Sequence, residues 1–140
     1  MVTAKTIMSR NVITVSRDED IYEAIRRMVQ NDVTGLPVVN ADGSLAGILT
    51  EKDVLDLLYR VRDRPGKVED YMTRSVVCFD SEDSIADIAA NFRNNHFRRV
   101  PILENGRLVG IISRKDIIRY LRDRCCESDV QNSTAETVCY

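Results

Sequence analysis

The stretch Gly47-Ile-Leu-Thr-Glu-Lys-Asp53 is repeated later in the chain as Gly110-Ile-Ile-Ser-Arg-Lys-Asp116. In both places it follows a tight-turn dipeptide, Asp42-Gly43 in the first copy and Asn105-Gly106 in the second. Internal repetition decides the architecture, because each copy must be one supersecondary unit that packs against its neighbour. The sequence therefore predicts one unit used twice.

Each copy of the repeat shows the same order of elements. Met8-Ser-Arg-Asn-Val12 corresponds to Met72-Thr-Arg-Ser-Val76, and both lead into a short β-type run. A helix with an apolar stripe follows, then a strand with an early proline, the tight turn, a second strand and a second helix. The predicted strands are 12–15, 36–39, 45–49, 76–79, 100–103 and 108–112. We therefore predict an α/β (α+β) fold of two β-α-β-β-α repeats packed about a pseudo-twofold axis.

The domain organisation follows from the repeat. One copy alone buries too little apolar surface to be stable, so we expect the two to pack against each other. Residues 1–64 hold the first repeat and the start of a linker, and residues 65–124 hold the second repeat. The polar segment 60–66 is the predicted linker. The apolar period stops after Arg124, so we expect residues 125–140 to form a flexible C-terminal tail.

The composition narrows the class of function. The chain has 140 residues, of which 20 are basic and 22 acidic, and a formal net charge of −2. This balance disfavours a nucleic-acid binder with a basic face. No apolar run reaches the roughly 20 residues that span a bilayer, and the N-terminus lacks the apolar core of a secretory signal. We therefore expect a cytoplasmic protein with neither a nucleic-acid nor a membrane partner.

Residue types that serve catalysis or metal binding are scarce. None of the four cysteines forms a C-x-x-C pair, and Cys78 lies in a predicted strand. The single histidine, His96, leaves little for acid–base catalysis, and no Walker-type phosphate loop is present. We therefore expect no metal site, no required cofactor and no enzymatic activity. The sequence assigns no role to Cys125, Cys126 and Cys139.

The repeated Thr50-x-x-Asp53 and Ser113-x-x-Asp116 pairs allow two interpretations. A hydroxyl residue followed three positions later by an acid is a good helix start, and this alone explains each pair. A strand-to-helix junction also exposes backbone N–H groups that suit a phosphate, while a carboxylate one turn later can accept both hydroxyls of a ribose. From the local pattern alone, both interpretations stay open.

The doubled unit resembles the cystathionine-β-synthase (CBS) domain family. The resemblance rests on the Leu36-Pro37-Val38 and Val100-Pro101-Ile102 strands together with the two Gly…Asp endings, and it extends from residue 5 to about residue 123. It implies a tandem CBS pair, or Bateman module, which is a regulatory binding module rather than an enzyme. Such pairs commonly bind AMP, ADP or ATP in clefts between the repeats, and they often form disc-like homodimers.

The resemblance also implies which residues contact a ligand. The aspartates Asp53 and Asp116 would hold ribose hydroxyls, and Thr50 and Ser113 would lie near phosphate. The family's contact on the first strand falls at Thr14 in one copy and at Val77-Cys78 in the other. The contacts around the proline fall at Gly35, Leu36, Pro37, Arg99, Val100 and Pro101.

The two copies differ at positions that matter for a ligand. Arg98 and Arg99 have no basic counterparts in the first copy; they either meet a phosphate or are solvated loop charges. Cys78 replaces Thr14 and removes a hydroxyl that could donate and accept hydrogen bonds. His96 fits a surface or packing role better than a ligand contact. We therefore expect two unequal clefts.

Two functions are compatible with these features of the sequence. The first is a non-catalytic sensor of adenine nucleotides that signals to a protein effector in trans or through its oligomeric state. The second is a structural dimerisation module whose clefts are vestigial. A sensor of another adenosyl ligand, such as S-adenosylmethionine or NAD, is a variant of the first. The aspartates present in both copies favour a sensor.

Overall fold

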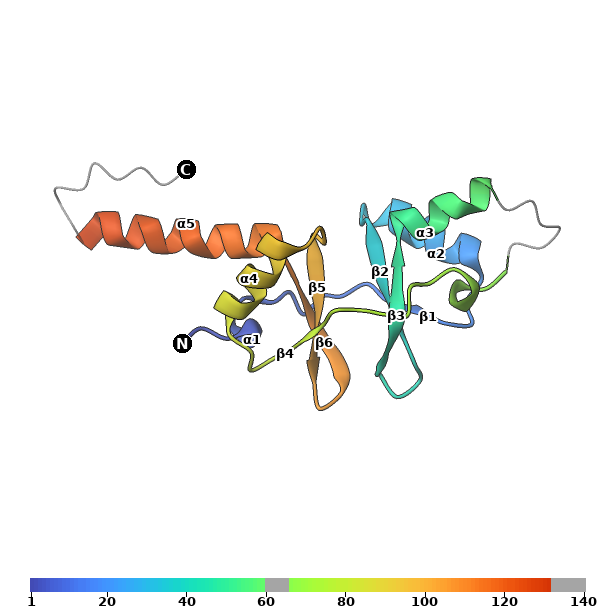
Figure 1. Cartoon of the computed structure of the whole chain (residues 1–140), viewed down its shortest axis with the longest axis horizontal. Coiled ribbons are helices and arrows are strands. Elements are labelled where there is room, and N and C mark those ends of the chain that lie inside the picture. Colours follow the sequence, from blue (N-terminus) through green and yellow to red (C-terminus); the bar gives the residue numbers. More distant parts are fainter. Residues whose placement is uncertain (60–65, 132–140) are drawn as a thin grey trace.

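The computed structural model describes residues 1–59 and 66–131, which form two similar three-stranded sheets (Figure 1). In each sheet a short first strand pairs in parallel with the second strand, which pairs antiparallel with the third. The first sheet contains β1 (Val15–Ser16), β2 (Gly35–Val39) and β3 (Leu45–Thr50). The second contains β4 (Phe79–Asp80), β5 (Arg99–Glu104) and β6 (Arg107–Ser113). The predicted α/β fold with two repeats is confirmed.

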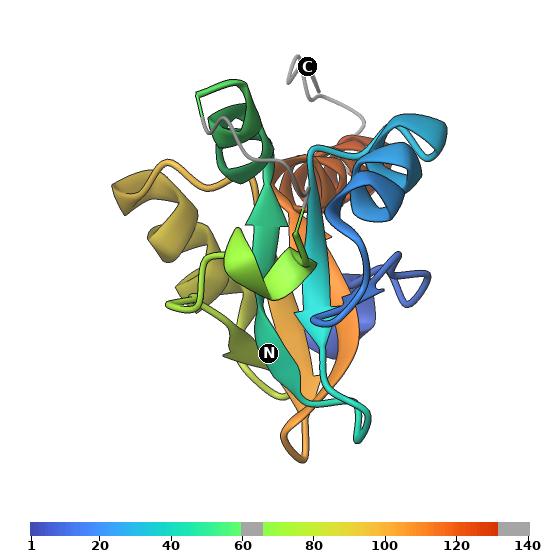
Figure 2. The ribbon, with the colours of Figure 1, turned by 90° about the vertical axis from the view of Figure 1, so that its right-hand side faces the viewer.

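The helices follow the predicted order. The two repeats contain α2 (Ile21–Gln30), α3 (Glu51–Leu55) with the 3-10 turn η1 (Asp56–Leu58), α4 (Ile85–Asn94) and α5 (Arg114–Gln131). Each repeat begins with one further short helical turn, α1 (Ala4–Ile7) or η2 (Val68–Asp70). Seen end-on, the two hairpins point the same way, and the helices lie at the opposite end of the molecule and on its flanks (Figure 2).

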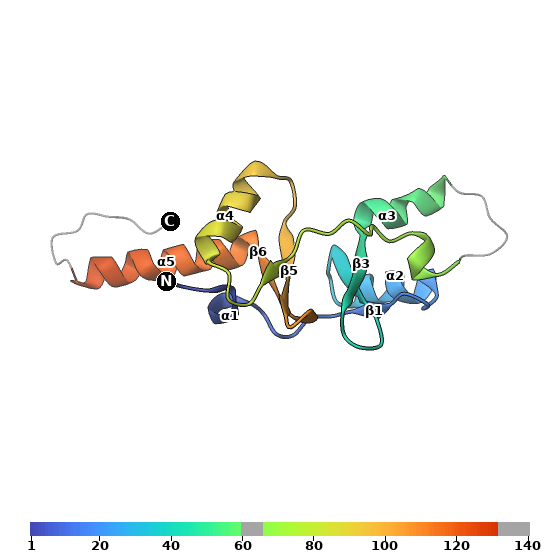
Figure 3. The same cartoon turned by 60° about the horizontal axis from the view of Figure 1, so that its bottom comes forward.

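Two elements differ from the sequence-based expectation. The first strands are only two residues long, because the residues before Val15 and Phe79 cross between the two sheets and do not pair with β2 or β5 (Figure 3). α5 continues to Gln131, past the expected start of the tail at residue 125, since no glycine or proline interrupts it. Residues 132–140 and the linker positions 60–65 lie outside the described residues.

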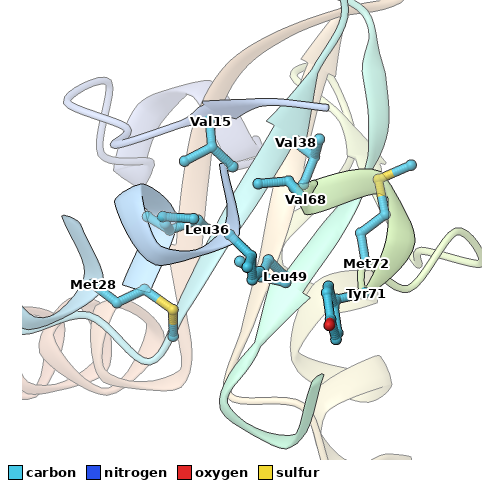
Figure 4. Close-up of a cluster of buried hydrophobic side chains, with 10 residues drawn as sticks. Val15, Met28, Leu36, Val38, Leu49, Val68, Tyr71 and Met72 are labelled. Atoms are coloured by element: carbon cyan, nitrogen blue, oxygen red, sulfur yellow. The ribbon is translucent and has the colours of Figure 1, made fainter. Parts of the chain in front are cut away.

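The segments that lead into the two repeats are exchanged between the two cores. Ala4 and Met8 are buried with the apolar residues of β5, β6 and α4. Conversely, Val68, Tyr71 and Met72 are buried with the residues of β2, β3 and α2 (Figure 4). Each hydrophobic core therefore needs residues from the lead segment of the other repeat.

Backbone hydrogen bonds fix this exchange in the same way on both sides. The amide of Thr73 donates to the carbonyl of Ile48 at 2.8 Å, and the amide of Ile48 donates back at 2.9 Å. Ser9 and Ile111 make the equivalent pair at 2.9 and 3.0 Å. The two bridges place each lead segment beside the last strand of the other repeat.

The glycines of the repeated motif make room for these bridges. A Cβ atom on Gly47 would lie 2.6 Å from the carbonyl oxygen of Thr73. One on Gly110 would lie 2.5 Å from Sδ of Met8 and 3.0 Å from the carbonyl oxygen of Ser9. Gly47 and Gly110 are therefore required by the close approach of the exchanged segment, whereas sequence reasoning treated them only as part of a binding signature.

Candidate functional site

Both Thr/Ser–Asp pairs form reciprocal helix caps. The amide and Oγ1 of Thr50 each donate to Oδ2 of Asp53 at 2.9 Å, and the amide of Asp53 donates to Oγ1 of Thr50 at 3.4 Å. In the second repeat the amide of Ser113 donates to Asp116 at 2.8 Å, and the amide of Asp116 donates to Oγ of Ser113 at 3.2 Å. The capping role is thus present, and both aspartates remain partly accessible.

Each aspartate has a second partner, and these partners differ. The hydroxyl of Thr73, from the exchanged segment, donates to both carboxylate oxygens of Asp53, at 3.0 and 3.2 Å. Asp116 instead pairs with the largely exposed Arg119, whose Nη1 lies 3.4 Å from Oδ1. Sequence reasoning missed Thr73, because only the exchange of lead segments brings it to Asp53. The signal that could have found it is the repeated Met-Ser/Thr dipeptide at Met8 and Met72.

A cavity of about 710 Å³ joins the two repeats beside Thr50; we call it the Thr50 cavity. The first repeat contributes the start of β2, the end of β3 and the start of α3, and the second contributes the loop between α4 and β5 with the first residue of β5. The lining residues are Thr34, Gly35, Ile48, Thr50, Glu51, Lys52, Asn95, His96, Phe97, Arg98 and Arg99. The structure therefore brings Thr50 together with Arg98 and Arg99, which are far apart in sequence.

The Thr50 cavity carries positive charge without matching partners. Within the described residues Lys52, Arg98 and Arg99 take part in no ion pair or hydrogen bond of their side chains. Nε of Arg99 is buried and has no hydrogen-bond partner. Glu51 is the one acidic residue among those lining this cavity. A buried donor without a partner costs free energy, and the exposed guanidinium and ammonium groups beside it are of the kind that bind anions.

A second, smaller cavity of about 70 Å³ lies beside residues 11–13, which cross between the two sheets. It is lined by Asn11, Val12, Ile13, Val33, Gly35, Pro37, Arg99 and Ile111, and we call it the Asn11 cavity. Because Ile111 bridges Ser9, this cavity adjoins the strand that ends at Ser113. The exchange thus groups the first repeat's lead segment and β2 with Arg99 and Ile111 of the second repeat, whereas neither Asp53 nor Asp116 lines the Thr50 cavity or the Asn11 cavity.

Several other residues that were predicted to contact a ligand line neither the Thr50 cavity nor the Asn11 cavity. Cys78 is exposed and lines a third cavity of about 200 Å³ with Arg74, Val76 and residues 44–47 of the first hairpin. Val77 is exposed, and the carbonyl of the half-buried Thr14 accepts a hydrogen bond from Arg27 at 2.7 Å. The side chains of Leu36, Val100 and Pro101 are fully buried. These three residues therefore offer no exposed side chain to a ligand.

Comparison with known proteins agrees with this architecture. The family model described as "CBS domain" matches residues 4–60 and 68–123, one match for each repeat. The chain belongs to the CBS domain family. It is a tandem CBS pair, a Bateman module, and the exchanged lead segments and the Thr50 cavity are features of this CBS pair.

Individual relatives and solved structures show how similar this chain is to known CBS proteins. Protein MJ1225 of Methanocaldococcus jannaschii is 38% identical over 117 residues, which cover 84% of this chain and 42% of that protein. The structure of CBSX2, a protein of Arabidopsis thaliana, in complex with AMP is 26% identical with a TM-score of 0.81, covering 89% of this chain and 98% of the other. The CBS pair of protein MJ0100, in complex with 5-methylthioadenosine and S-adenosyl-L-methionine, is 26% identical with a TM-score of 0.75 and the same coverage.

These findings establish the coarse class of the module. CBS pairs of this fold include ligand-binding regulatory modules, some with AMP or an adenosyl compound bound. The chain spans less than half of the length of MJ1225, so that protein's activity as a whole does not carry over. In the part of the chain that the structure describes, no helix is long and apolar enough to cross a membrane. No group of three or more potential metal-ligating side chains occurs among the described residues.

Proposed function

We propose that this CBS pair is a non-catalytic sensor that binds an adenine nucleotide, AMP, ADP or ATP, between its repeats. The observation that carries the proposal is the Thr50 cavity, in which unpaired cations of the second repeat face Thr50 of the first. Guanidinium groups bind phosphate oxygens in a bidentate manner, so Arg98 and Arg99 suit the phosphate. The AMP complex of CBSX2, a protein of the same fold, supports this ligand class.

The aspartates supply the second half of the proposed site. Asp53 and Asp116 are half-buried, and a carboxylate has room for about four hydrogen-bond donors. A ribose diol can therefore be accepted in addition to the capping bonds, with Thr73 or Arg119 giving way. Thr14, Gly35, Pro37, Val77 and Cys78 lie on the segments that would border the base. We expect the two clefts to be unequal and the nucleotide to bind in the Thr50 cavity first, since only this cavity contains both Arg98 and Arg99 and the Asn11 cavity measures about 70 Å³.

A ligand between the repeats can act as a signal. It would touch both repeats, and binding that favours one relative arrangement shifts the population toward that arrangement. We further propose that the output reaches an effector protein in trans, or a second copy in a homodimer, in the cytoplasm. The alternative function is a structural dimerisation module with vestigial clefts. The large apolar side chains that the helices expose are compatible with a homodimer under either function.

Isothermal titration with AMP, ATP, S-adenosylmethionine and NAD tests the proposal. We expect Asp53→Ala and Asp116→Ala each to weaken one site about 10- to 100-fold, because a hydrogen bond to a charged group contributes about 1.5–3 kcal/mol. The matched control is Asp56→Ala, which removes an exposed carboxylate of the same helical segment that makes no side-chain hydrogen bond or ion pair within the described residues.

Two results would contradict the sensor. If none of the four ligands bound at millimolar concentration, the dimerisation module would be the better description. If both alanine variants lost stability but kept wild-type affinity, the aspartates would be helix caps and nothing more.

A further inference from the structure

The side chain of Arg114 makes three hydrogen bonds to the end of α4 and the loop that carries Arg98 and Arg99. This residue is the first of α5 and directly follows Ser113. Its Nε donates to the carbonyl of Phe97 at 2.8 Å, and its Nη2 donates to the carbonyls of Phe92 at 2.9 Å and Asn95 at 2.6 Å. Its backbone amide donates to the carbonyl of Arg98 at 2.9 Å. Arg114 therefore contacts the backbone at four positions from the last turn of α4 to the start of β5.

The chemistry of arginine suits this position. Helix α4 ends at Asn94, and the last carbonyls of a helix have no partner within the helix. The guanidinium presents five N–H donors in a rigid plane, so it can satisfy several carbonyls at once. Its central carbon also lies 5.8 Å from the centroid of the Phe92 ring, which gives a cation–π contact. The loop is thus fixed at its base while Arg98 and Arg99 extend into the Thr50 cavity.

The described part of the first repeat has no equivalent clamp. Glu51 occupies the position of Arg114 in the repeat, and its amide makes the corresponding backbone bond to the carbonyl of Thr34 at 3.1 Å. A carboxylate, however, cannot donate to carbonyl oxygens. Among residues 1–59 and 66–131 the side-chain clamp is therefore confined to the second repeat, whose loop bears the two arginines that face the cavity.

We propose that Arg114 is a positioning residue for phosphate recognition: it pre-organises the Arg98–Arg99 loop so that a nucleotide phosphate, but not an uncharged nucleoside, gains from the contact. The inference rests on the proposed function, since it assumes that Arg98 and Arg99 bind the phosphate. Ordering a long side chain or loop on binding costs affinity, and a loop that is already ordered avoids this cost. Arg114 also adjoins the Ser113–Asp116 cap, so it connects this cap with the loop that carries the two arginines.

The experiment compares AMP with adenosine by isothermal titration, in the full chain. The wild type is expected to bind AMP more tightly than adenosine. In Arg114→Gln the preference for AMP is expected to fall about tenfold, while the adenosine affinity changes less than about twofold. The control is Lys115→Gln, which removes the same charge from the neighbouring, exposed residue that has no side-chain partner among the described residues and is expected to keep the preference.

Arg114→Lys keeps the charge and the aliphatic stem but loses the planar fork, so it separates geometry from charge. We expect it to lose most of the preference as well, and circular dichroism would verify that each variant is folded. Retention of the AMP preference in both Arg114 variants, or an equal loss of AMP and adenosine affinity, would overturn the positioning role. A wild type without any AMP preference would instead overturn phosphate binding by Arg98 and Arg99, and with it the inference.

Discussion

At the scale of single residues, Gly47 and Gly110 should be intolerant of any side chain, but not equally so. The Cβ of Gly47→Ala would meet the Thr73 carbonyl at 2.6 Å, and this carbonyl is held by its bridge to Ile48. The nearest atom to the corresponding Cβ of Gly110→Ala is the flexible end of Met8, at 2.5 Å. Overpacking costs about 1–3 kcal/mol, so we expect Gly47→Ala near the upper end of this range and Gly110→Ala below it.

Urea unfolding monitored by circular dichroism would measure both glycine variants. The free energy of unfolding should decrease in the order wild type, Gly110→Ala, Gly47→Ala. If Gly47→Ala were as stable as the wild type, the exchanged segment would not lie against β3 as described.

Some residues of the candidate site could be identified from the sequence, and others could not. Thr50, Asp53 and their counterparts could be identified because capping chemistry is local and has a fixed spacing. The Arg98–Arg99 pair stood out because its repeat partner lacks charge. Thr73 and Arg114 could not be identified, since their roles depend on contacts across 20 or 17 positions that local pattern does not report.

At the scale of elements, helices of both repeats expose large apolar side chains. In the first repeat Val29 is 75% exposed, Leu58 80% and Tyr59, which directly follows η1, 84%; in the second repeat Ile118 is 63% exposed. Helices α2, α3 and α5 lie along the same edge of the molecule, opposite the hairpin tips (Figure 1). Monomeric proteins rarely expose extended apolar patches, and a self-complementary face favours a twofold dimer.

We therefore expect Leu58→Glu and Ile118→Glu to shift the chain toward monomer, because each places a charge in the apolar contact. Light scattering coupled to size-exclusion chromatography would measure the mass. Ala41→Glu, at the exposed tip of the first hairpin, adds the same charge away from the helices and should leave the mass unchanged. A wild type that is monomeric at every concentration would contradict the dimer.

The elements themselves were largely predictable. Both hairpins could be identified from Asp42-Gly43 and Asn105-Gly106, and Asn105, Gly106 and Gly43 have the positive φ angles that such turns require. The first strands were predicted too long, because the β propensity of residues 12–14 and 76–78 does not reveal that these residues cross between sheets. α5 was predicted too short, since the apolar period ends before the helix does.

At the scale of the whole molecule, the exchange of lead segments is the property that sequence reasoning could not supply. The two halves of a repeat protein are alike, so apolar residues such as Met8 and Met72 fit either core equally well by pattern. Which core they join depends on the path of the backbone between the sheets. The exchange explains why the two repeats form one unit: Met8 belongs to the lead segment of the first repeat but completes the core of the second.

The pair Met8→Ala and Met72→Ala tests this reciprocity, because the two residues are repeat equivalents and are both 8% exposed. Truncating a buried methionine costs about 2–5 kcal/mol, so both variants should be destabilised to a similar extent. Their local effects should be crossed. Met8→Ala should increase amide hydrogen exchange mainly in β5 and β6, and Met72→Ala mainly in β2 and β3, as measured by site-resolved mass spectrometry. If each variant instead loosened the sheet of its own repeat, the lead segments would pack without exchange, and the joining of the two repeats through their cores would be wrong.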